Sequence, residues 1–381
     1  MHELEAIVLA HANSIHKEEP MFLATIVNTV GSTYRQKGAK MLVRANGEMV
    51  GTLSGGCVEN DVFEYTKQIV NEPLLIDYDA TKVEDDLIWG FGLGCNGAIQ
   101  ILLEKLDDKS PISPIQLISH CLSTKSVGAI ATLISTKGSI PLKLGSRLVV
   151  YPDGTTQTDI SDHALIEVIE NDVLSAKKNR KSTVINYQFA SGTIEVFIDV
   201  IHPPNSLVIF GAGRDALPVV TSAKAIGWHV TVVDCRVLQK TYQRFAIADH
   251  IILARSKAIA QHLSIDEHTA TVVMTHNYFD DLDIIKFLFS TNAPYVGVMG
   301  SKSRIAKLIE QLNPTQTQLK TLHSPIGLDI GAETPAEIAS AIIAEIQAVF
   351  AKRNAGFNKH HGQPLHSKDR TLHKSIYENR L

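Results

Sequence analysis

The sequence predicts an α/β protein with two parts: an N-terminal α+β domain built from an internal duplication, and a C-terminal domain with a Rossmann-like parallel sheet. The 381 residues are too many for one hydrophobic core. Two segments of the first two hundred residues resemble each other, and strand and helix patterns alternate after residue 205. We expect the first copy at 1–110, the second at 111–202, the Rossmann-like domain at 203–355 and a polar basic tail at 356–381.

The two copies align over their strands and turns. The segment from Ala24 is ATIVNTVGSTYRQKGAKMLVRANGEMVGT, and the segment from Ala131 is ATLISTKGSIPLKLGSRLVVYPDGTTQTD. Further on, GCNGAIQILLEKL from Gly94 aligns with ASGTIEVFIDVI from Ala190. Each copy is expected to form a strand, a Gly-Ser turn, a strand, a hairpin, a strand, a helix and two more strands. An amphipathic helix is expected in the first twenty residues, where apolar side chains recur at helical spacing.

Positions that differ between the copies predict a site in the first copy. Arg35 and Lys37 align with Leu142 and Leu144. The loops Ser54-Gly55-Gly56-Cys57 and Gly92-Leu93-Gly94-Cys95-Asn96-Gly97 have no cysteine in the second copy. Cys57 precedes a predicted helix, whose dipole favours a thiolate, so it is a candidate soft ligand or nucleophile. The alternative is that two glycine turns happen to contain cysteines.

The other two cysteines are expected to be buried. Cys121 lies in a predicted helix and Cys235 at the end of a predicted strand, where a small hydrophobic side chain fits. The four cysteines form no CxxC pair, which argues against a zinc ribbon, an iron–sulfur cluster or a disulfide framework.

The C-terminal part begins after a linker at His202-Pro203-Pro204-Asn205. Its expected strands are rich in Val, Ile and Leu and are separated by helices, which predicts a parallel sheet covered on both faces. These strands lie in SLVIFGAG, HVTVVDCR, HIILAR, TATVVMTHN, YVGVMGS and SPIGLDIG. The last helix is expected from Pro335, with Thr334 as N-cap and Glu337 completing a capping box. The residues after Asn354 are expected to form a loosely ordered tail.

A glycine loop after the first of these strands predicts a ligand site. Gly211-Ala212-Gly213-Arg214 precedes a helix, and Asp234 ends the next strand about twenty residues on. The glycines let backbone amides approach a phosphate, Asp234 would accept from a ribose hydroxyl, and Arg236 would meet a phosphate. We expect a nucleotide or a dinucleotide such as NAD(P) here, with an empty scaffold as the alternative.

Three more loops follow strands of the same sheet, at the edge where ligands bind in such folds. In one of them, Gly300, Ser301 and Arg304 are expected to form an anion cradle at a helix start. His276 in a second loop is a candidate acid or base, or a histidine satisfied by its neighbours. The third loop is Gly327-Leu328-Asp329-Ile330-Gly331.

The composition excludes several partners. A net charge of −4 provides no basic field for nucleic acid and no polybasic patch for a membrane. The N-terminus lacks the cationic start of a signal peptide, and no apolar run is long enough to span a bilayer. We therefore expect a cytoplasmic protein that contacts neither nucleic acid nor membrane.

Several motifs together resemble the XdhC/CoxI family, whose members are accessory proteins of xanthine dehydrogenase and of aerobic carbon monoxide dehydrogenase. They are GSTYRQKGAKMLV, VGTLSGGCVEND, GLGCNG, FGAGRDALP, VTVVDCR, VVMTHN, YVGVMGSKSR and PIGLDIGAETPAEIA, and the resemblance covers residues 15 to 350. Asn96 stands where the family often has a glycine, so the backbone beside Cys95 is less accessible.

The resemblance implies that the protein binds a molybdopterin-type molybdenum cofactor, holds it during sulfuration and delivers it to a xanthine dehydrogenase-like client enzyme. A cysteine desulfurase is a further implied partner, and we expect a homodimer. Cys57 and Cys95 would be the molybdenum ligands. The full set of expected cofactor residues is Arg35, Lys37, Gly55, Gly56, Cys57, Gly94, Cys95, Gly211, Gly213, Arg214, Asp234, Arg236, Gly300, Ser301 and Arg304.

Two other classes of function stay open on the residues alone. An NAD(P)-dependent oxidoreductase would use the Rossmann-like domain, with His276 as its candidate catalytic residue, and a protein adaptor would bind no small molecule. We do not expect xanthine dehydrogenase itself, because that enzyme needs cysteine-rich iron–sulfur modules and a far larger molybdenum domain, which four scattered cysteines cannot provide. We expect an insertion factor rather than an enzyme.

Overall fold

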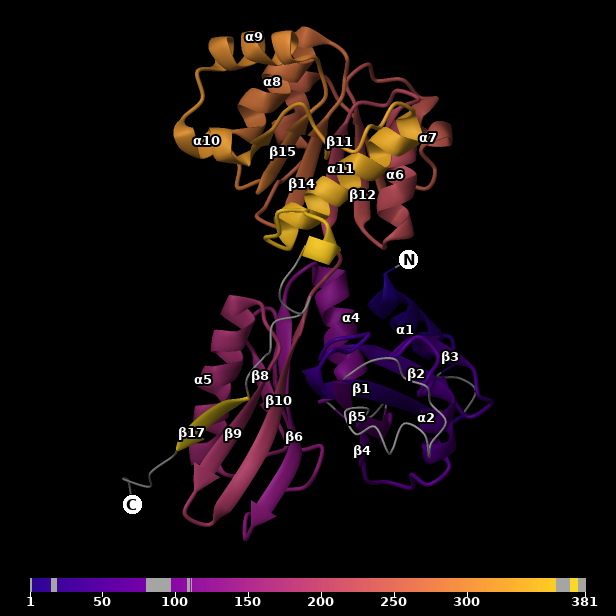
Figure 1. Cartoon of the computed structure of the whole chain (residues 1–381), viewed down its shortest axis with the longest axis vertical. Helices are drawn as coiled ribbons and strands as arrows, with labels where there is room; N and C mark the ends of the chain where they lie inside the picture. Colours follow the sequence, from indigo (N-terminus) through magenta and orange to yellow (C-terminus); the bar gives the residue numbers. More distant parts are fainter. Residues whose placement is uncertain are drawn as a thin grey trace. The chain divides into compact units, whose positions relative to one another are not determined.

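The chain forms two compact units, which we call the N-terminal unit (Glu3–Pro203) and the Rossmann unit (Pro204–His360). This computed structural model describes residues 2–14, 19–79, 97–107, 110, 112–360 and 371–375. Figure 1 labels most of the helices and strands of both units. No helix among the described residues has the length and the apolar content that crossing a membrane requires.

The N-terminal unit consists of two copies of one fold, as predicted. The first copy contains β1 (Met21–Gly31), β2 (Lys40–Arg44), β3 (Met49–Gly51), α2 (Glu59–Thr66), β4 (Leu74–Asp79) and β5 (Gly97–Lys105). The second contains β6 (Gly128–Gly138), β7 (Arg147–Val150), β8 (Thr156–Thr158), α5 (His163–Asn179), β9 (Thr183–Phe189) and β10 (Gly192–Ile201). The strand orders β3-β2-β1-β5-β4 and β8-β7-β6-β10-β9 are the same. Helices α1 (Glu3–Ala12) and α4 (Pro114–Thr124) precede the two copies.

The duplication extends to irregularities of the backbone. In the pairing of β1 with β5 the register shifts at Val27, and in the pairing of β6 with β10 it shifts at Ile134, the aligned residue. The N–H of Gly38 donates to the carbonyl of Ile26 at 2.8 Å, and the N–H of Gly145 donates to Leu133 at 2.9 Å. A β-bulge shared by the copies shows that both inherited the same bend.

Each sheet buries one face under its own helix and the other face against the second sheet. On alternate positions of β1, Ala24 and Ile26 pack with Val62 of α2. Leu23, on the opposite face of β1, shares a core with Ile130 of β6. This alternation follows from the two-residue period of a strand. Each fully buried Leu or Ile contributes about 1.5–3 kcal/mol to this packing.

Two buried ion pairs link the copies, and the duplication relates them. Lys40 on β2 pairs with Asp199 on β10, and Arg147 on β7 pairs with Glu104 on β5. Lys40 aligns with Arg147, and Glu104 aligns with Asp199. Each copy therefore contributes one cation and one anion to the interface between the sheets.

The Rossmann unit has a six-stranded parallel sheet in the order β13-β12-β11-β14-β15-β16. Its strands are β11 (Ser206–Phe210), β12 (His229–Asp234), β13 (His250–Leu253), β14 (Thr269–Val273), β15 (Tyr295–Val298) and β16 (Leu322–His323). Its helices are α6 (Ala216–Ala225), α7 (Thr241–Arg244), α8 (Tyr278–Leu288), α9 (Lys302–Leu312), α10 (Gln316–Thr321) and α11 (Pro335–Phe350), with 3-10 turns at Ser256–Gln261 and Asn358–His360. This is the doubly wound order in which ligands bind where the order reverses, here between β11 and β14.

Local signals placed most elements correctly. The capping box of α11 is present, with Thr334 accepting from the N–H of Glu337. Two expectations were wrong. The sixth strand is Leu322–His323 and not the SPIGLDIG segment, because Pro325 has no N–H to donate and Gly327 has a φ of +97°. The tail is ordered at β17 (Leu372–Ser375), which adds a parallel strand to β9.

Candidate functional site

The first copy presents Cys57 on a glycine-rich loop between β3 and α2. Cys57 is exposed. Gly55 and Gly56 have φ values of +80° and +117°, which residues with a side chain rarely adopt. A side chain at Gly55 would also meet the ring of Tyr34 at 3.2 Å, whereas the space around Gly56 is open. The glycines thus turn the chain sharply just before the cysteine.

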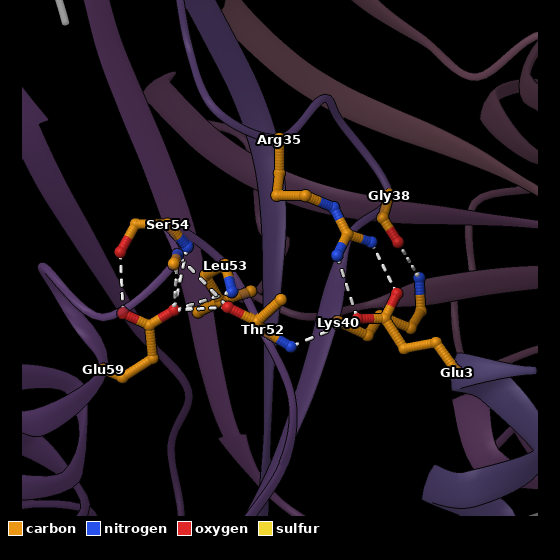
Figure 2. Close-up of polar contacts among 9 residues, drawn as sticks. Glu3, Arg35, Gly38, Lys40, Thr52, Leu53, Ser54 and Glu59 are labelled. Atoms are coloured by element: carbon orange, nitrogen blue, oxygen red, sulfur yellow. Dashed lines mark hydrogen bonds and ion pairs between the residues drawn. The ribbon is translucent and has the colours of Figure 1, made fainter. Parts of the chain in front are cut away.

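The carboxylate of Glu59 lies inside this loop and binds its backbone, as Figure 2 shows for part of the network. It accepts from the N–H groups of Leu53, Ser54, Gly55, Gly56 and Val58 at 2.8–3.2 Å. The hydroxyls of Thr52 and Ser54 also donate to it. The N–H of Cys57 donates to the Ser54 hydroxyl. The chain's own carboxylate therefore occupies most of the N–H donors at this helix start, where the sequence predicted that the helix dipole favours a thiolate.

Glu59 is buried but ionised at neutral pH. Desolvation raises its pKa, but the hydrogen bonds from Ser54, Thr52 and Leu53 outweigh this, so the pKa falls from its usual 4.5 to about 2. A carboxylate with a lowered pKa stabilises the fold above its unfolded-state pKa. The contribution of Glu59 is therefore complete above about pH 4.5 and is lost as the pH falls toward 2.

Arg35 lies beside this loop, as the comparison of the copies predicted, but its guanidinium is engaged. It forms two hydrogen bonds to the carboxylate of Glu3 on α1. Glu3 also accepts from the N–H of Thr52 at 3.2 Å, which ties Arg35 to the start of the cysteine loop (Figure 2). Lys37 follows in the same turn. Gly94 and Cys95 lie outside the described residues.

Cys121 and Cys235 are buried, as expected. Burial raises the pKa of both thiols to about 12, so both stay protonated. Among the described cysteines, Cys57 is thus the exposed one. The described residues contain no cluster of three or more His, Cys, Asp or Glu that could hold a metal ion without further ligands.

In the Rossmann unit, Asp215 and His276 meet at the place where the strand order reverses. Asp215 Oδ2 lies 2.7 Å from His276 Nε2. His276 follows β14 with a φ of +61°, unusual for a residue other than glycine. A Cβ on Gly213 would lie 2.2 Å from Asp215 Oδ1, so this carboxylate covers the second glycine of the loop. Arg214 is exposed beside it.

Asp234 ends β12 as predicted, but its side chain is 1% exposed. Its oxygens accept from Arg236 at 2.9 Å and from Thr241 at 2.5 Å. Burial by itself would raise the pKa of Asp234, but these hydrogen bonds lower it below its usual range. The carboxylate that was expected to bind a ribose is therefore buried and already accepts hydrogen bonds from the chain itself. Arg236 also donates to the carbonyl of Ala212 in the glycine loop.

The expected anion cradle at Gly300 and Ser301 begins α9. Ser301 caps the helix by accepting from the N–H of Arg304. Arg304 donates to the buried carboxylate of Asp281 at 2.6 Å, and its guanidinium lies over the ring of Tyr278. Asp281 also accepts from Thr275, so this network joins the loops after β14 and β15.

The fold and these sites define a class of two-part protein, in which a duplicated α+β unit that displays a cysteine on a glycine-rich loop is joined to a Rossmann domain. The chain belongs to the XdhC and CoxI family. It matches that family over residues 14–79 and 121–188, once in each copy, and the XdhC Rossmann domain over residues 207–346. The family expected from the motifs is therefore confirmed.

Three relatives show how far the similarity extends. A Bacillus subtilis (strain 168) protein, named as a probable subunit of xanthine dehydrogenase, is 34% identical over 334 residues, which are 87% of this chain and 94% of that protein. The molybdenum cofactor insertion chaperone PaoD of Escherichia coli (strain K12) is 23% identical over 86% of this chain and 82% of its own length. A crystal structure described as a xanthine dehydrogenase from Bacillus halodurans is 29% identical, covers 93% of this chain and 97% of that one, and superposes with a TM-score of 0.75.

Proposed function

We propose that this protein is an accessory protein that binds molybdenum cofactor and holds it for insertion into a xanthine dehydrogenase-type enzyme. One observation carries the proposal: Cys57 is exposed on a loop found in one copy only, in a chain that resembles a molybdenum cofactor insertion chaperone over 82% of the chaperone's length. The cofactor is cargo here, so the protein needs to bind, shield and release it.

The cysteine loop fits the metal end of this cargo better than its phosphate end. A thiolate is a soft ligand of the kind that molybdenum accepts, and the open space around Gly56 leaves room beside it. The loop N–H groups already bind Glu59 and Ser54, and Arg35 already binds Glu3. We propose that Cys57 and Cys95 hold the metal and that Gly56 leaves space for it. Gly55 and Gly94 are the further glycines of the two cysteine motifs, and Lys37 adds positive charge.

Replacing Cys57 with alanine is expected to lower the molybdenum retained per chain at least about tenfold, since even second-shell changes at metal sites cost that much. Cys121→Ala and Cys235→Ala are the controls, because both thiols are buried. Molybdenum is measured by mass spectrometry in protein purified from a molybdenum-replete host. Equal molybdenum in all three variants would remove Cys57 from the site, and Cys95→Ala is tested in the same way.

In the Rossmann unit we propose a site for a phosphate-bearing ligand, either a nucleotide or a molybdopterin cofactor. The proposed residues are Gly211, Gly213, Arg214, Asp234 and Arg236, with Gly300, Ser301 and Arg304 at the neighbouring loops. Arg214 supports this best, because it is exposed at the start of α6 and no hydrogen bond or ion pair with another described residue engages it. A phosphate there would meet a cation and a helix N-terminus together.

Arg214→Gln is expected to weaken this binding about tenfold, the loss of one charge-assisted hydrogen bond. Lys286→Gln at the far end of α8 removes the same charge and should leave affinity unchanged. Titration calorimetry with NAD, NADP, ATP, CTP and free molybdopterin cofactor measures both. If wild type binds none of them, this unit is a scaffold. Turnover of a hydroxy or carbonyl substrate with NAD(P) would instead favour an oxidoreductase.

Further partners follow from the same proposal. A cysteine desulfurase would supply the sulfur for the cofactor while the protein holds it. We also propose a homodimer and a cytoplasmic location, both of which suit a protein that passes its cargo to an enzyme.

A further inference from the structure

The carboxylate of Glu59 accepts hydrogen bonds along most of the cysteine loop. Five consecutive or nearly consecutive N–H groups, from Leu53 to Val58, point toward one carboxylate. The hydroxyls of Thr52 and Ser54 also donate to this carboxylate. Ser54 in turn accepts from the N–H groups of Cys57 and Val58. Within the described residues no strand pairs with this loop, and its N–H groups donate to Glu59 and Ser54 instead.

This arrangement belongs to the copy that carries the cysteine. In the second copy the aligned helix α5 begins at an ordinary N-cap, Asp162, which accepts from Ala164 and Leu165 only. The first residue of α5 is His163, where α2 has Glu59, and continuing the strand alignment without a gap instead places Ile166 opposite Glu59. A helix start in this fold therefore needs only a simple cap, and the larger network accompanies the displayed thiol.

We propose that Glu59 is a positioning residue, which holds the Thr52–Val58 loop in one conformation so that the Cys57 thiol stands where the molybdenum cofactor is bound. The inference rests on the proposed function. Glu59 is 9% exposed and lies under the loop, so it acts on the cofactor through Cys57 and not by contact. The network also requires a carboxylate at this position. Both carboxylate oxygens accept hydrogen bonds from these donors, whereas the NH2 group of an amide cannot accept them.

The test compares Glu59→Gln with two controls in the same helix. Glu64→Gln removes a charge that pairs with Lys67 at the surface. Val62→Ala weakens a core cluster that includes Leu53 and Val58 of the loop, but it leaves the carboxylate of Glu59 and its hydrogen bonds in place. Molybdenum per chain, the Tm and amide hydrogen exchange of residues 52–58 are measured for each. We expect Glu59→Gln to speed exchange in the loop at least about tenfold. It should lose molybdenum to the same extent as Cys57→Ala. Val62→Ala should lower the Tm yet keep its molybdenum.

A rescue experiment separates positioning from stability. The variant is Glu59→Ala, and acetate has the carbon and oxygen atoms that this change removes beyond Cβ. A high concentration of acetate is expected to slow amide hydrogen exchange in the loop of this variant and to restore its molybdenum, whereas chloride at equal ionic strength should do neither. The assignment is overturned if Glu59→Gln retains wild-type molybdenum, or if Val62→Ala loses as much as Glu59→Gln. If the wild-type protein carries no molybdenum, the proposed function is overturned as well. If the wild-type protein carries molybdenum and Glu59→Gln carries the same amount, the positioning role alone is overturned.

Discussion

Replacing Lys40 with methionine is expected to destabilise the N-terminal unit by about 3–5 kcal/mol, because Asp199 would remain buried without its cation. The side chains of Lys40 and Asp199 are 2% and 5% exposed, so water cannot replace the lost partner. Ser182 also donates to Asp199, but a single hydroxyl does not neutralise its charge. Denaturant-dependent hydrogen exchange of β1 and β6 measures the change in the free energy of unfolding.

Two further variants decide whether the effect comes from the buried charge. Lys67→Met breaks an ion pair whose side chains are 57% and 61% exposed, and it should cost less than about 0.5 kcal/mol. The double variant Lys40→Met, Asp199→Leu removes both charges and should recover most of the loss. If Lys40→Met costs no more than Lys67→Met, the ion pair does not stabilise the interface between the copies.

Gly211→Ala is expected to destabilise the Rossmann unit by about 3–5 kcal/mol. Gly211 has a φ of +133°, and a Cβ there would lie 2.3 Å from the carbonyl oxygen of Met274. That contact is with backbone, so relieving it would pull the end of β11 away from β14. Trp228 lies in the core of this unit, and its fluorescence during urea unfolding reports the change.

Gly331→Ala is the matched control for the conformation alone. Gly331 lies in the same unit with a φ of +73°, but a Cβ there would meet nothing within 4 Å. Its substitution should cost about 1–2 kcal/mol, the usual cost of a left-handed residue. Equal losses for the two variants would mean that the contact with Met274 contributes nothing, and that the glycine loop tolerates a side chain.

Much of the fold was predictable because its signals are local. Asn46-Gly47 and Asp153-Gly154 form the predicted hairpin turns, with positive φ at both glycines. The aligned glycines of the two copies likewise marked equivalent turns before any contact was known. The prediction misplaced the sixth Rossmann strand, because a strand of two residues is too short to show a periodic pattern. The apolar SPIGLDIG segment that follows it resembles a strand.

The candidate site was only half predictable. The comparison of the copies singled out the loop on which the structure exposes Cys57, and it singled out Arg35, which the structure connects to that loop through Glu3. The comparison did not indicate a role for Glu59, although the copies differ at this position too, because a glutamate at the start of a helix is common. In the Rossmann unit, the sequence pattern did not indicate that the carboxylate of Asp215 covers Gly213. The cysteine loop was expected to present a thiolate and the Rossmann loop to bind a phosphate, and in both a carboxylate of the chain itself lies against the loop.

The sequence by itself determined the fold class, the duplication, the family and the loop that displays Cys57. Turn residues, caps and the period of apolar side chains act within a few neighbours, and alignment of the copies needs no coordinates. Only the tertiary structure decided which charges meet. Lys40 pairs with Asp199 across 159 residues, and Asp215 reaches His276 across 61. Such pairs depend on where strands far apart in the chain end, and a charged side chain has the same sequence signature whether it binds a ligand or another part of its own chain.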